Sequence, residues 1–276
     1  MPNDQSLPLN ENSNEINNDS SIQINGHLEL NESSPLIHEL DEKVDQGCQF
    51  APTDLVCVFD GHGGCESSNW LSTNLPQTFE KGLELSETGL FQLIKDTSIA
   101  LSKQNFADGS AAIIAILQGH LKEKLHLVNI GDSRAIVVTK KYRVKYSTVD
   151  HKPTTRSEFE RIHASHGFIV NGRVCGYLAI PRSFGDKFIV GVTSKPSLIE
   201  IDIDVNEDRW LILGCDGIFN ILSNERIAAA TRSCDNADDL ALYLRNLAFS
   251  FSSYDNISII VVDLMKRRTS LSNDHQ

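Results

Sequence analysis

The 276-residue sequence contains no apolar run close to the roughly 18 residues that a membrane-spanning helix needs. Its first 30 residues lack the basic stretch followed by an apolar stretch that marks a secretory signal peptide. These absences argue against a membrane partner and against secretion. We therefore expect an intracellular protein, cytoplasmic, with the nucleus left open.

The cysteines and histidines do not occur at the spacings that are usual in zinc-binding motifs. The six cysteines form no CxxC pair, and the nine histidines form no HExxH motif. Cys57 and Cys215 stand inside the apolar runs "DLVCVF" and "LILGCDG". Buried free thiols are therefore a better interpretation than disulfides or zinc ligands.

Basic residues are absent from the first 42 positions, which hold nine of the 37 acidic residues. The rest of the chain has 28 acidic and 25 basic residues, so the net charge of −12 belongs mostly to the N-terminal segment. A body without basic surplus argues against a nucleic-acid partner. Eight Asn among residues 1–34 predict disorder over roughly residues 1–20, although a marginal hairpin at Asn25-Gly26 stays possible.

From Asp54 onward the chain contains short runs rich in β-branched and apolar residues. Seven of them predict strands: "LVCVF", "AAIIAIL", "KLHLVNI", "RAIVVT", "YRVKYSTV", "RWLILG" and "ISIIVV". The fourth and fifth read as a hairpin that turns at Lys140-Lys141. Strands in such succession, interrupted by helices, favour an α+β fold with antiparallel sheets covered by helices.

Helices are predicted at three places between these runs. Apolar residues recur at helical spacing over residues 88–103. Thr155 with Glu158, and Asn236 with Asp239, have the residue types of a capping box and predict two further helix starts. Gly167 fits the end of the first of these two helices.

Three acidic residues share one local pattern, an Asp beside Gly or Asn at the end of an apolar strand. Asp60 in "VCVFDG" and Asp216 in "LILGCDG" follow a strand, and Asp255 in "YDNISIIVV" precedes one. One Asp-Gly alone usually marks a turn, but three converging carboxylates repel one another unless a cation lies among them. Hard oxygen ligands indicate Mg²⁺ or Mn²⁺, and Gly61 would let a backbone carbonyl approach the ion.

Seven motifs, in order, resemble those of the metal-dependent Ser/Thr protein phosphatases of type 2C. They are "DGHGG", "DGSAAIIAIL", "VNIGDSRAIV", "DHKPTTRSEFERI", "GRVCGYLAIPRSFGD", "LILGCDGIFNIL" and "SYDNISIIVV". The resemblance covers about residues 54–263. It implies a four-layer α-β-β-α sandwich, two antiparallel sheets flanked by helices. We expect a phosphatase-like domain over residues 21–265, between a disordered segment at 1–20 and a short basic and polar tail at 266–276.

The resemblance also implies a site that holds two Mg²⁺ or Mn²⁺ ions and acts on phosphorylated proteins. Asp60 matches the residue that bridges both ions, the Gly61 carbonyl a ligand of one, and Asp216 and Asp255 ligands of the other. A metal-bridged hydroxide would attack phosphorus in line. His62 matches the general acid for the leaving alcohol, with a hydrogen-bonded turn histidine as its alternative.

Other motif residues are expected to be mostly structural. Asp132 in "GDSR" matches a residue that can hold a third, weaker ion, and a role in a buried turn is an equal alternative. "GRVCGYLAIPRSFGD" resembles the segment that shapes a flap beside the cleft, with Pro181 as a small departure. Asn220 stands where the family usually has a second Asp after Asp216, so any third metal site should be weak or missing.

The chain departs from the family upstream of Asp60, where a phosphate-binding Arg and a Glu-Asp pair are usual. No arginine precedes Arg134, and Lys43, the one basic residue before Asp60, could supply charge but no bidentate fork. The nearest acidic residues that could replace the Glu-Asp pair are Glu39, Asp41 and Glu42. For these three, a solvated acidic surface is the better interpretation.

Two hypotheses follow from these departures. The first is a Mg²⁺- or Mn²⁺-dependent phosphatase for phosphoserine and phosphothreonine, favoured by the carboxylates and His62. The second is a weak or inactive pseudophosphatase of the same fold that binds a signalling partner, favoured by the missing Arg and the altered Glu-Asp pair.

Overall fold

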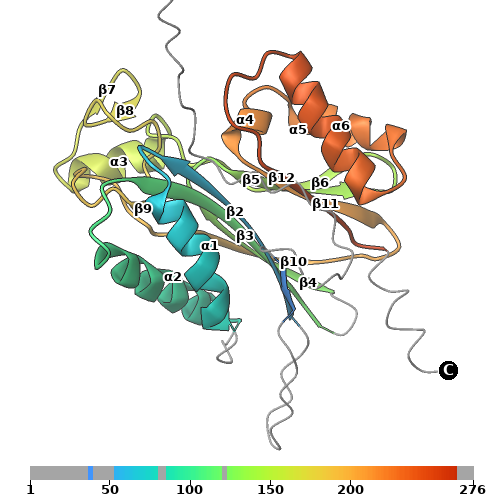
Figure 1. Ribbon diagram of the computed structural model, residues 1–276, viewed down its shortest axis with the longest axis horizontal. Helices are drawn as coiled ribbons and strands as arrows, with labels where there is room; N and C mark the ends of the chain where they lie inside the picture. Colours follow the sequence, from blue (N-terminus) through green and yellow to red (C-terminus); the bar gives the residue numbers. More distant parts are fainter. Residues whose placement is uncertain (1–36, 40–52, 80–84, 120–122, 266–276) are drawn as a thin grey trace, which may run out of the picture.

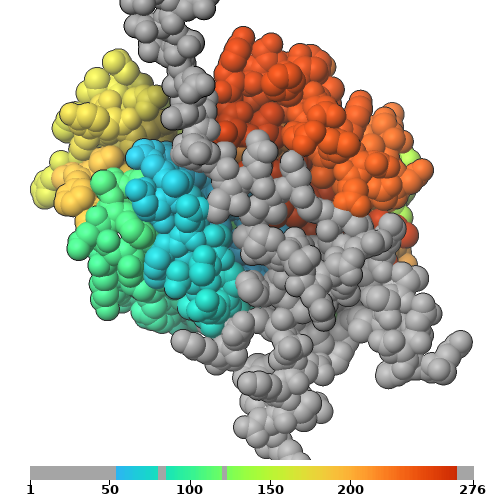
Figure 2. Space-filling model, in the orientation of Figure 1, coloured from blue at the N-terminus to red at the C-terminus, as the bar shows by residue number. Residues whose placement is uncertain are grey.

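The computed structural model describes residues 37–39, 53–79, 85–119 and 123–265. Two antiparallel sheets pack face to face, and helices cover the outer face of each sheet (Figure 1). In the space-filling view these helices lie on opposite sides of the molecule (Figure 2). The predicted four-layer α-β-β-α sandwich is confirmed.

The first sheet has the order β1-β2-β3-β4-β10, and a short strand, β9, pairs with the start of β3. Its strands are β1 (Ile37–Glu39), β2 (Thr53–His62), β3 (Gly109–Gln118), β4 (Lys124–Ile130), β9 (Phe184–Gly185) and β10 (Ser197–Asp202). The second sheet has the order β12-β11-β5-β6. Its strands are β5 (Arg134–Thr139), β6 (Val144–Ser147), β11 (Asp208–Gly214) and β12 (Ile259–Asp263).

Strand β3 shows why its sequence is apolar at almost every position. Ile113, Ala115 and Leu117 face the second sheet, where they join the layer between the sheets. Ala112, Ile114 and Ile116 alternate with them and face the outer helices. Because both faces are covered, the usual polar and apolar alternation of a half-exposed strand is lost.

Helices α1 (Glu66–Phe79) and α2 (Glu87–Ser102) cover the first sheet. The predicted helix over residues 88–103 is thus confirmed as α2, which buries Leu90, Ile94 and Leu101 on one face. Helices α4 (Asp216–Phe219), α5 (Asn224–Ala230) and α6 (Ala237–Ser250) cover the second sheet, with a 3₁₀ turn at Thr231–Ser233. No helix in these described segments is both long and apolar enough to cross a bilayer.

The two predicted capping boxes have different outcomes. Asn236 caps α6 as predicted, because its side-chain oxygen accepts from the Asp239 backbone N–H at 2.8 Å. Thr155 precedes α3 (Arg156–Ala164), but its side chain makes no capping bond. Its hydroxyl instead donates to the Lys152 carbonyl at 2.7 Å. The chain leaves α3 at His166, whose φ of 63° is left-handed.

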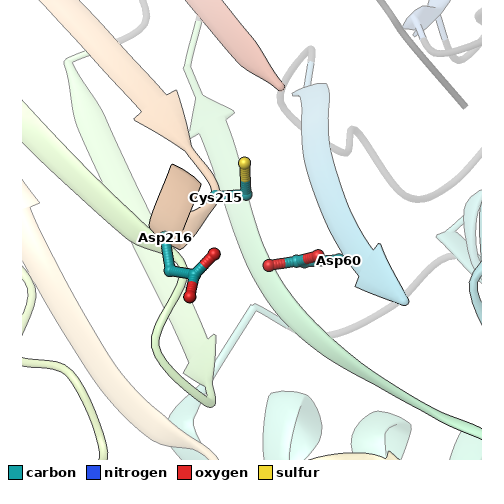
Figure 3. Close-up of side chains that lie close together, drawn as sticks. All are labelled: Asp60, Cys215 and Asp216. Atoms are coloured by element: carbon teal, nitrogen blue, oxygen red, sulfur yellow. The ribbon is translucent and has the colours of Figure 1, made fainter. Parts of the chain in front are cut away.

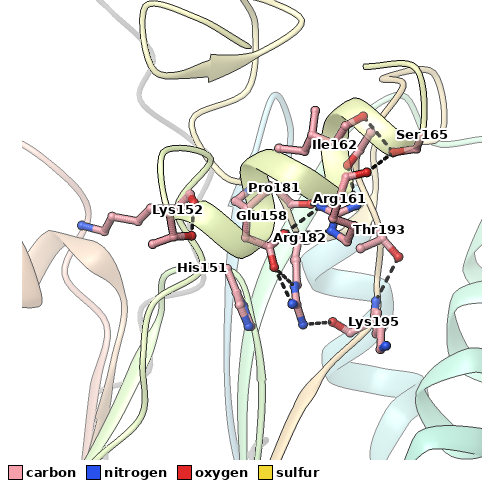
Figure 4. A network of polar contacts seen from close by, with 12 residues as sticks. His151, Lys152, Glu158, Arg161, Ile162, Ser165, Pro181, Arg182, Thr193 and Lys195 are labelled. Carbon is pink, nitrogen blue, oxygen red and sulfur yellow. Dashed lines mark hydrogen bonds and ion pairs between the residues drawn. The ribbon is translucent and has the colours of Figure 1, made fainter. Parts of the chain in front are cut away.

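Helix α3 and the short hairpin of β7 (Ile169–Val170) and β8 (Arg173–Val174) project at one edge of the sandwich (Figure 1). Glu158, with a 3% exposed side chain, ties this flap to the following segment. Arg161 and Arg182 both donate to Glu158 from their Nε atoms at 2.9 Å (Figure 4). Arg161 also reaches the Pro181 carbonyl at 2.9 Å. Pro181 and Arg182 of "GRVCGYLAIPRSFGD" thus have the structural role expected for this segment. Its last residue, Asp186, instead contacts His62 of the candidate site.

Among the described residues, five cysteines are free thiols, and those that are buried are Cys57, Cys215 and Cys234. The prediction of buried free thiols is confirmed for these three. Cys48 lies outside the described residues.

Candidate active site

Asp60 lies near the end of β2, opposite Ala111 on β3. The strand continues to His62, and Gly63, at a φ of 73°, then turns the chain toward α1. The Asp108 carboxylate receives the start of α1, because the Ser67 backbone N–H donates to it at 3.1 Å and the Ser67 hydroxyl at 2.6 Å. The sequence "DGHGG" is thus a strand end followed by a turn that is anchored to the start of β3.

Asp216 and Asp255 come from the second sheet. Asp216 is the first residue of α4, directly after β11 and Cys215, and Asp255 precedes β12, which pairs with β11. Figure 3 shows the carboxylates of Asp60 and Asp216 pointing toward each other, with Cys215 beside them. One potential ligand atom from each of these three residues lies within 4.8 Å of the other two. The structure thus brings Asp60 and Asp216 together, whereas Asp255 is not in this group of three and acts on both carboxylates through its charge.

The Cys215 sulfur is engaged by two backbone groups. Its sulfur donates to the Asn256 carbonyl at 3.2 Å and accepts from the Ser258 backbone N–H at 3.1 Å. Burial, with a smaller contribution from Asp60, raises the pKa of Cys215 to about 12. Since only a thiolate binds metal well, the carboxylates are the donor set of this cluster.

The carboxylates of the cluster oppose one another's ionisation. Burial raises the pKa of Asp60 to about 7, and Asp216, Asp132 and Asp255 add to the rise through their charge. The pKa of Asp132 is likewise raised to about 7, first by burial and then by Asp216 and Asp150. Burial and Asp255 raise the pKa of Asp216. Such a group of oxygen donors fits a divalent cation, which would offset the repulsion.

Asp132 therefore belongs to the electrostatic environment of the cluster. The two roles weighed for it from the sequence, a ligand of a third ion and a buried turn residue, stay predictions. Asn220, at the position of the missing second Asp, donates a hydrogen bond from its side-chain amide to Asp216 at 3.0 Å.

The Gly61 backbone lies between Asp60 and His62, and a Cβ at Gly61 would lie 2.7 Å from the Ser68 hydroxyl oxygen. A side chain at Gly61 would thus require Ser68 to shift, and its Cβ would also lie 3.0 Å from the Gly64 carbonyl oxygen.

His62 has a partner that sequence reasoning missed. Its Nε2 lies 2.7 Å from Oδ2 of Asp186, whose side chain is 6% exposed. Burial lowers the pKa of His62, but the hydrogen bond and charge of Asp186, with Asp60 and Asp132, outweigh burial and raise it. Asp186 ends the segment "GRVCGYLAIPRSFGD", and 124 residues separate it from His62, so no local pattern could join them.

Of the candidate residues upstream of Asp60, the structure describes only Glu39, and its strand position lies away from the cluster. Strand β1 pairs with β2 so that Glu39 lies opposite Asp54, six positions from Asp60. Six residues of strand span roughly 20 Å, so the suitable sequence spacing of Glu39 does not bring it to the cluster. Asp41, Glu42 and Lys43 lie outside the described residues.

Arg134, the first arginine of the chain, is already engaged beside the cluster. Its Nε donates to Asp150 at 2.8 Å and one terminal nitrogen to the same carboxylate at 2.7 Å. The other terminal nitrogen donates to Asn224 at 2.8 Å, and the guanidinium lies 4.7 Å from the Phe219 ring centroid. With its donors used in this way, Arg134 stabilises the fold beside the site and does not replace the missing phosphate-binding arginine.

Comparisons with known proteins identify the family of this chain. The family model "Protein phosphatase 2C" matches residues 32–257. "Protein phosphatase 2C homolog 1" of Saccharomyces cerevisiae is 28% identical over 228 residues, which are 75% of this chain and 80% of the relative. "Probable protein phosphatase 2C 76" of Arabidopsis thaliana is 34% identical over 223 residues, 77% of this chain and 52% of the relative.

Solved structures share the fold at low sequence identity. A phosphatase from a pathogenic strain of Toxoplasma gondii matches with a TM-score of 0.70 at 20% identity, over 76% of this chain and 84% of that one. A bacterial serine phosphatase matches with a TM-score of 0.59 at 19% identity, over 77% and 87% of the two chains. The chain spans most of the yeast relative's length but about half that of the Arabidopsis relative.

Proposed function

Because the chain belongs to the protein phosphatase 2C family, we propose that it is a Mg²⁺- or Mn²⁺-dependent protein phosphatase for phosphoserine and phosphothreonine. The observation that carries the proposal is the approach of Asp60 and Asp216 from two sheets, with Asp255 near enough to act on both through its charge. Their neighbour Asp132 and Asp60 itself both have a pKa raised to about 7. A cluster that costs free energy when ionised is typical of a functional cation site.

In this proposal Asp60, the Gly61 carbonyl, Asp216 and Asp255 hold two ions. When bound, such ions offset the charge of the carboxylates and of the phosphoryl group and activate water for attack on phosphorus. His62 holds a proton for the serine or threonine oxygen that leaves. Cys215 stays a thiol and keeps Asn256 and Ser258 in place beside the ligands.

The test combines hydrolysis of a phosphothreonine peptide with calorimetric titration of Mn²⁺. Asp60→Asn and Asp216→Asn should each lower the peptide turnover and the Mn²⁺ affinity by at least about 100-fold, since losing a direct ligand costs more than losing an outer partner. The matched control is Asp96→Asn, an exposed carboxylate on α2, which should behave as wild type. Equal turnover by wild type and both cluster variants would contradict the proposal.

A second candidate is an inactive member of the fold that binds a signalling partner. Two observations favour this candidate. Glu39 lies opposite Asp54, at the far end of β2 from Asp60, and Arg134 already donates to Asp150, so neither residue takes the place of the missing Arg or of the Glu-Asp pair. The same titration separates the two candidates. Wild type that binds Mn²⁺ but turns over no phosphopeptide would support the second candidate over the first.

A further inference from the structure

The His62–Asp186 contact is built by three neighbouring strands. Gly109 of β3 pairs with His62 of β2 on one side and with Gly185 of β9 on the other. Asp186 follows Gly185 directly, and its carboxylate crosses Gly109 to reach His62 at 2.7 Å. The pairing register of β9, together with that of β2, therefore brings the carboxylate to the imidazole.

Gly109 keeps the space for this contact open. A Cβ at Gly109 would lie 2.1 Å from Oδ2 of Asp186 and 2.6 Å from Nε2 of His62. Both distances are too short for any real side chain. The two contacting atoms thus meet directly above a position that only glycine can occupy.

Asp186 is held in place from several sides. The Ser183 hydroxyl donates to the same Oδ2, and the Asp186 backbone N–H donates to the Asp108 carbonyl at 3.3 Å. The backbone φ of Asp186 is 48°, in the left-handed region, which Asp and Asn adopt more readily than other residues with a side chain. The Ser183 hydroxyl and the backbone bond to Asp108 thus hold the carboxylate in place.

The chemistry of the two groups determines which ring nitrogen faces the reaction. An ionised carboxylate can only accept hydrogen bonds, so Nε2 must carry the hydrogen of this contact. Nδ1 is then the nitrogen left to serve a substrate. We propose that Asp186 is the positioning residue of His62, which fixes the imidazole so that proton donation occurs from Nδ1.

This inference rests on the proposed function, in which His62 protonates the leaving oxygen. The ring starts with both nitrogens protonated, and the Nδ1 proton moves to the serine or threonine oxygen as its bond to phosphorus breaks. The ring ends neutral, with the Nε2 hydrogen still donated to Asp186. Asp186 therefore selects the tautomer that remains after each turnover.

The test uses leaving groups that differ in their need for a proton. In the full chain with Mn²⁺, Asp186→Asn should lower kcat on a phosphothreonine peptide by about 10- to 100-fold, part of the effect expected of general acid catalysis. Hydrolysis of p-nitrophenyl phosphate, whose leaving group needs little protonation, should fall by less than about 3-fold, and KM for both should stay near wild type. Equal loss on both substrates would show a merely structural role and overturn the inference.

His62→Gln separates failure of this inference from failure of the proposed function. His62→Gln should show the same selective loss, and adding Asp186→Asn to it should change kcat no further. If His62→Gln itself shows no dependence on the leaving group, the proposed role of His62 fails. If His62→Gln is selective and Asp186→Asn is not, only the role of Asp186 fails.

A measurement on the wild-type protein covers the case in which Asp186→Asn does not fold. Nitrogen-15 chemical shifts of the His62 ring in the Mg²⁺-loaded protein report which nitrogen carries the hydrogen when the ring is neutral. We expect Nε2 protonated and Nδ1 bare. The opposite tautomer would overturn the inference.

Discussion

Replacing Asp60 by Asn should stabilise the metal-free protein, although it removes a ligand. Burial and the neighbouring carboxylates raise the pKa of Asp60 from 3.8 to about 7. A raised carboxyl pKa means that ionising the group in the folded state costs free energy. At pH 8 that cost amounts to up to about 4 kcal/mol, which the neutral amide of Asn avoids.

The sign of this effect sets its pH window. Between pH 3.8 and about 7 the folded protein binds more protons at Asp60 than the unfolded chain does, so wild-type stability falls as pH rises through this range. The advantage of Asp60→Asn should therefore be absent below pH 3.8, grow with pH and level off above 7. Between pH 5 and pH 8 it should increase by roughly 2–3 kcal/mol.

Bound metal should reduce the difference in stability between Asp60→Asn and wild type, because it stabilises wild type more. A ligand that binds only the folded state at 100 times its Kd adds about 2.7 kcal/mol of stability. Wild type should gain this with Mn²⁺, and Asp60→Asn should gain far less because it lacks the shared ligand.

The assay is urea unfolding followed by tryptophan fluorescence at pH 5 and 8, with EDTA and with Mn²⁺, and one of the two tryptophans, Trp210, is fully buried. Asp96→Asn controls for the loss of one negative charge on the surface. If metal-free Asp60→Asn is less stable than wild type at pH 8, or if the difference is the same at both pH values, the repulsive cluster does not exist as described.

Two further predictions concern the network in Figure 4. Burial and Arg182 lower the pKa of His151 from 6.5 to about 4, so its contribution to stability is present above pH 6.5 and is lost as pH falls toward 4. From pH 7.5 to pH 5, wild type should lose about 2 kcal/mol more stability than His151→Asn, measured by urea unfolding, and equal losses would refute this. Glu158→Gln should cost about 3–5 kcal/mol because it leaves Arg161 and Arg182 without their buried anion. Glu160→Gln, exposed on the same helix, should change stability by less than about 0.5 kcal/mol, and similar Tm values for the two variants would contradict the assignment.

Much of the fold could be predicted because its elements have strong local periodicity. The seven predicted strands, which are β2 to β6, β11 and β12, the hairpin of β5 and β6, and helix α2 follow from apolar spacing, whereas β10 was not predicted. Strands β1, β7, β8 and β9 have two or three residues each, and their pairing depends on partners far along the chain. The helix start predicted at Thr155 is confirmed, but the capping bonds are absent, since Arg182 and Arg161 hold the Glu158 side chain that would have completed the box.

The candidate site could be predicted where a residue type at a strand end was itself informative. Asp60, Asp216 and Asp255 share that pattern, and in the structure the charges of Asp216 and Asp255 raise the pKa of Asp60. Glu39 has a suitable spacing along the sequence but lies opposite Asp54, away from the cluster, because spacing does not report strand register. Asp186 could not be found at all, since its role depends on the pairing of β9 with β3.

The two parts of the proposed chemistry depend on different parts of the fold. The carboxylates come from both sheets, with Asp60 on β2 and Asp216 after β11, so their separation depends on the apolar layer between the sheets. His62 and Asp186, in contrast, both belong to the first sheet through β2 and β9. A shift between the sheets would change the carboxylate cluster and leave the imidazole and its partner together. Metal affinity and proton delivery are therefore separable properties of this molecule, and a variant that weakens one need not weaken the other.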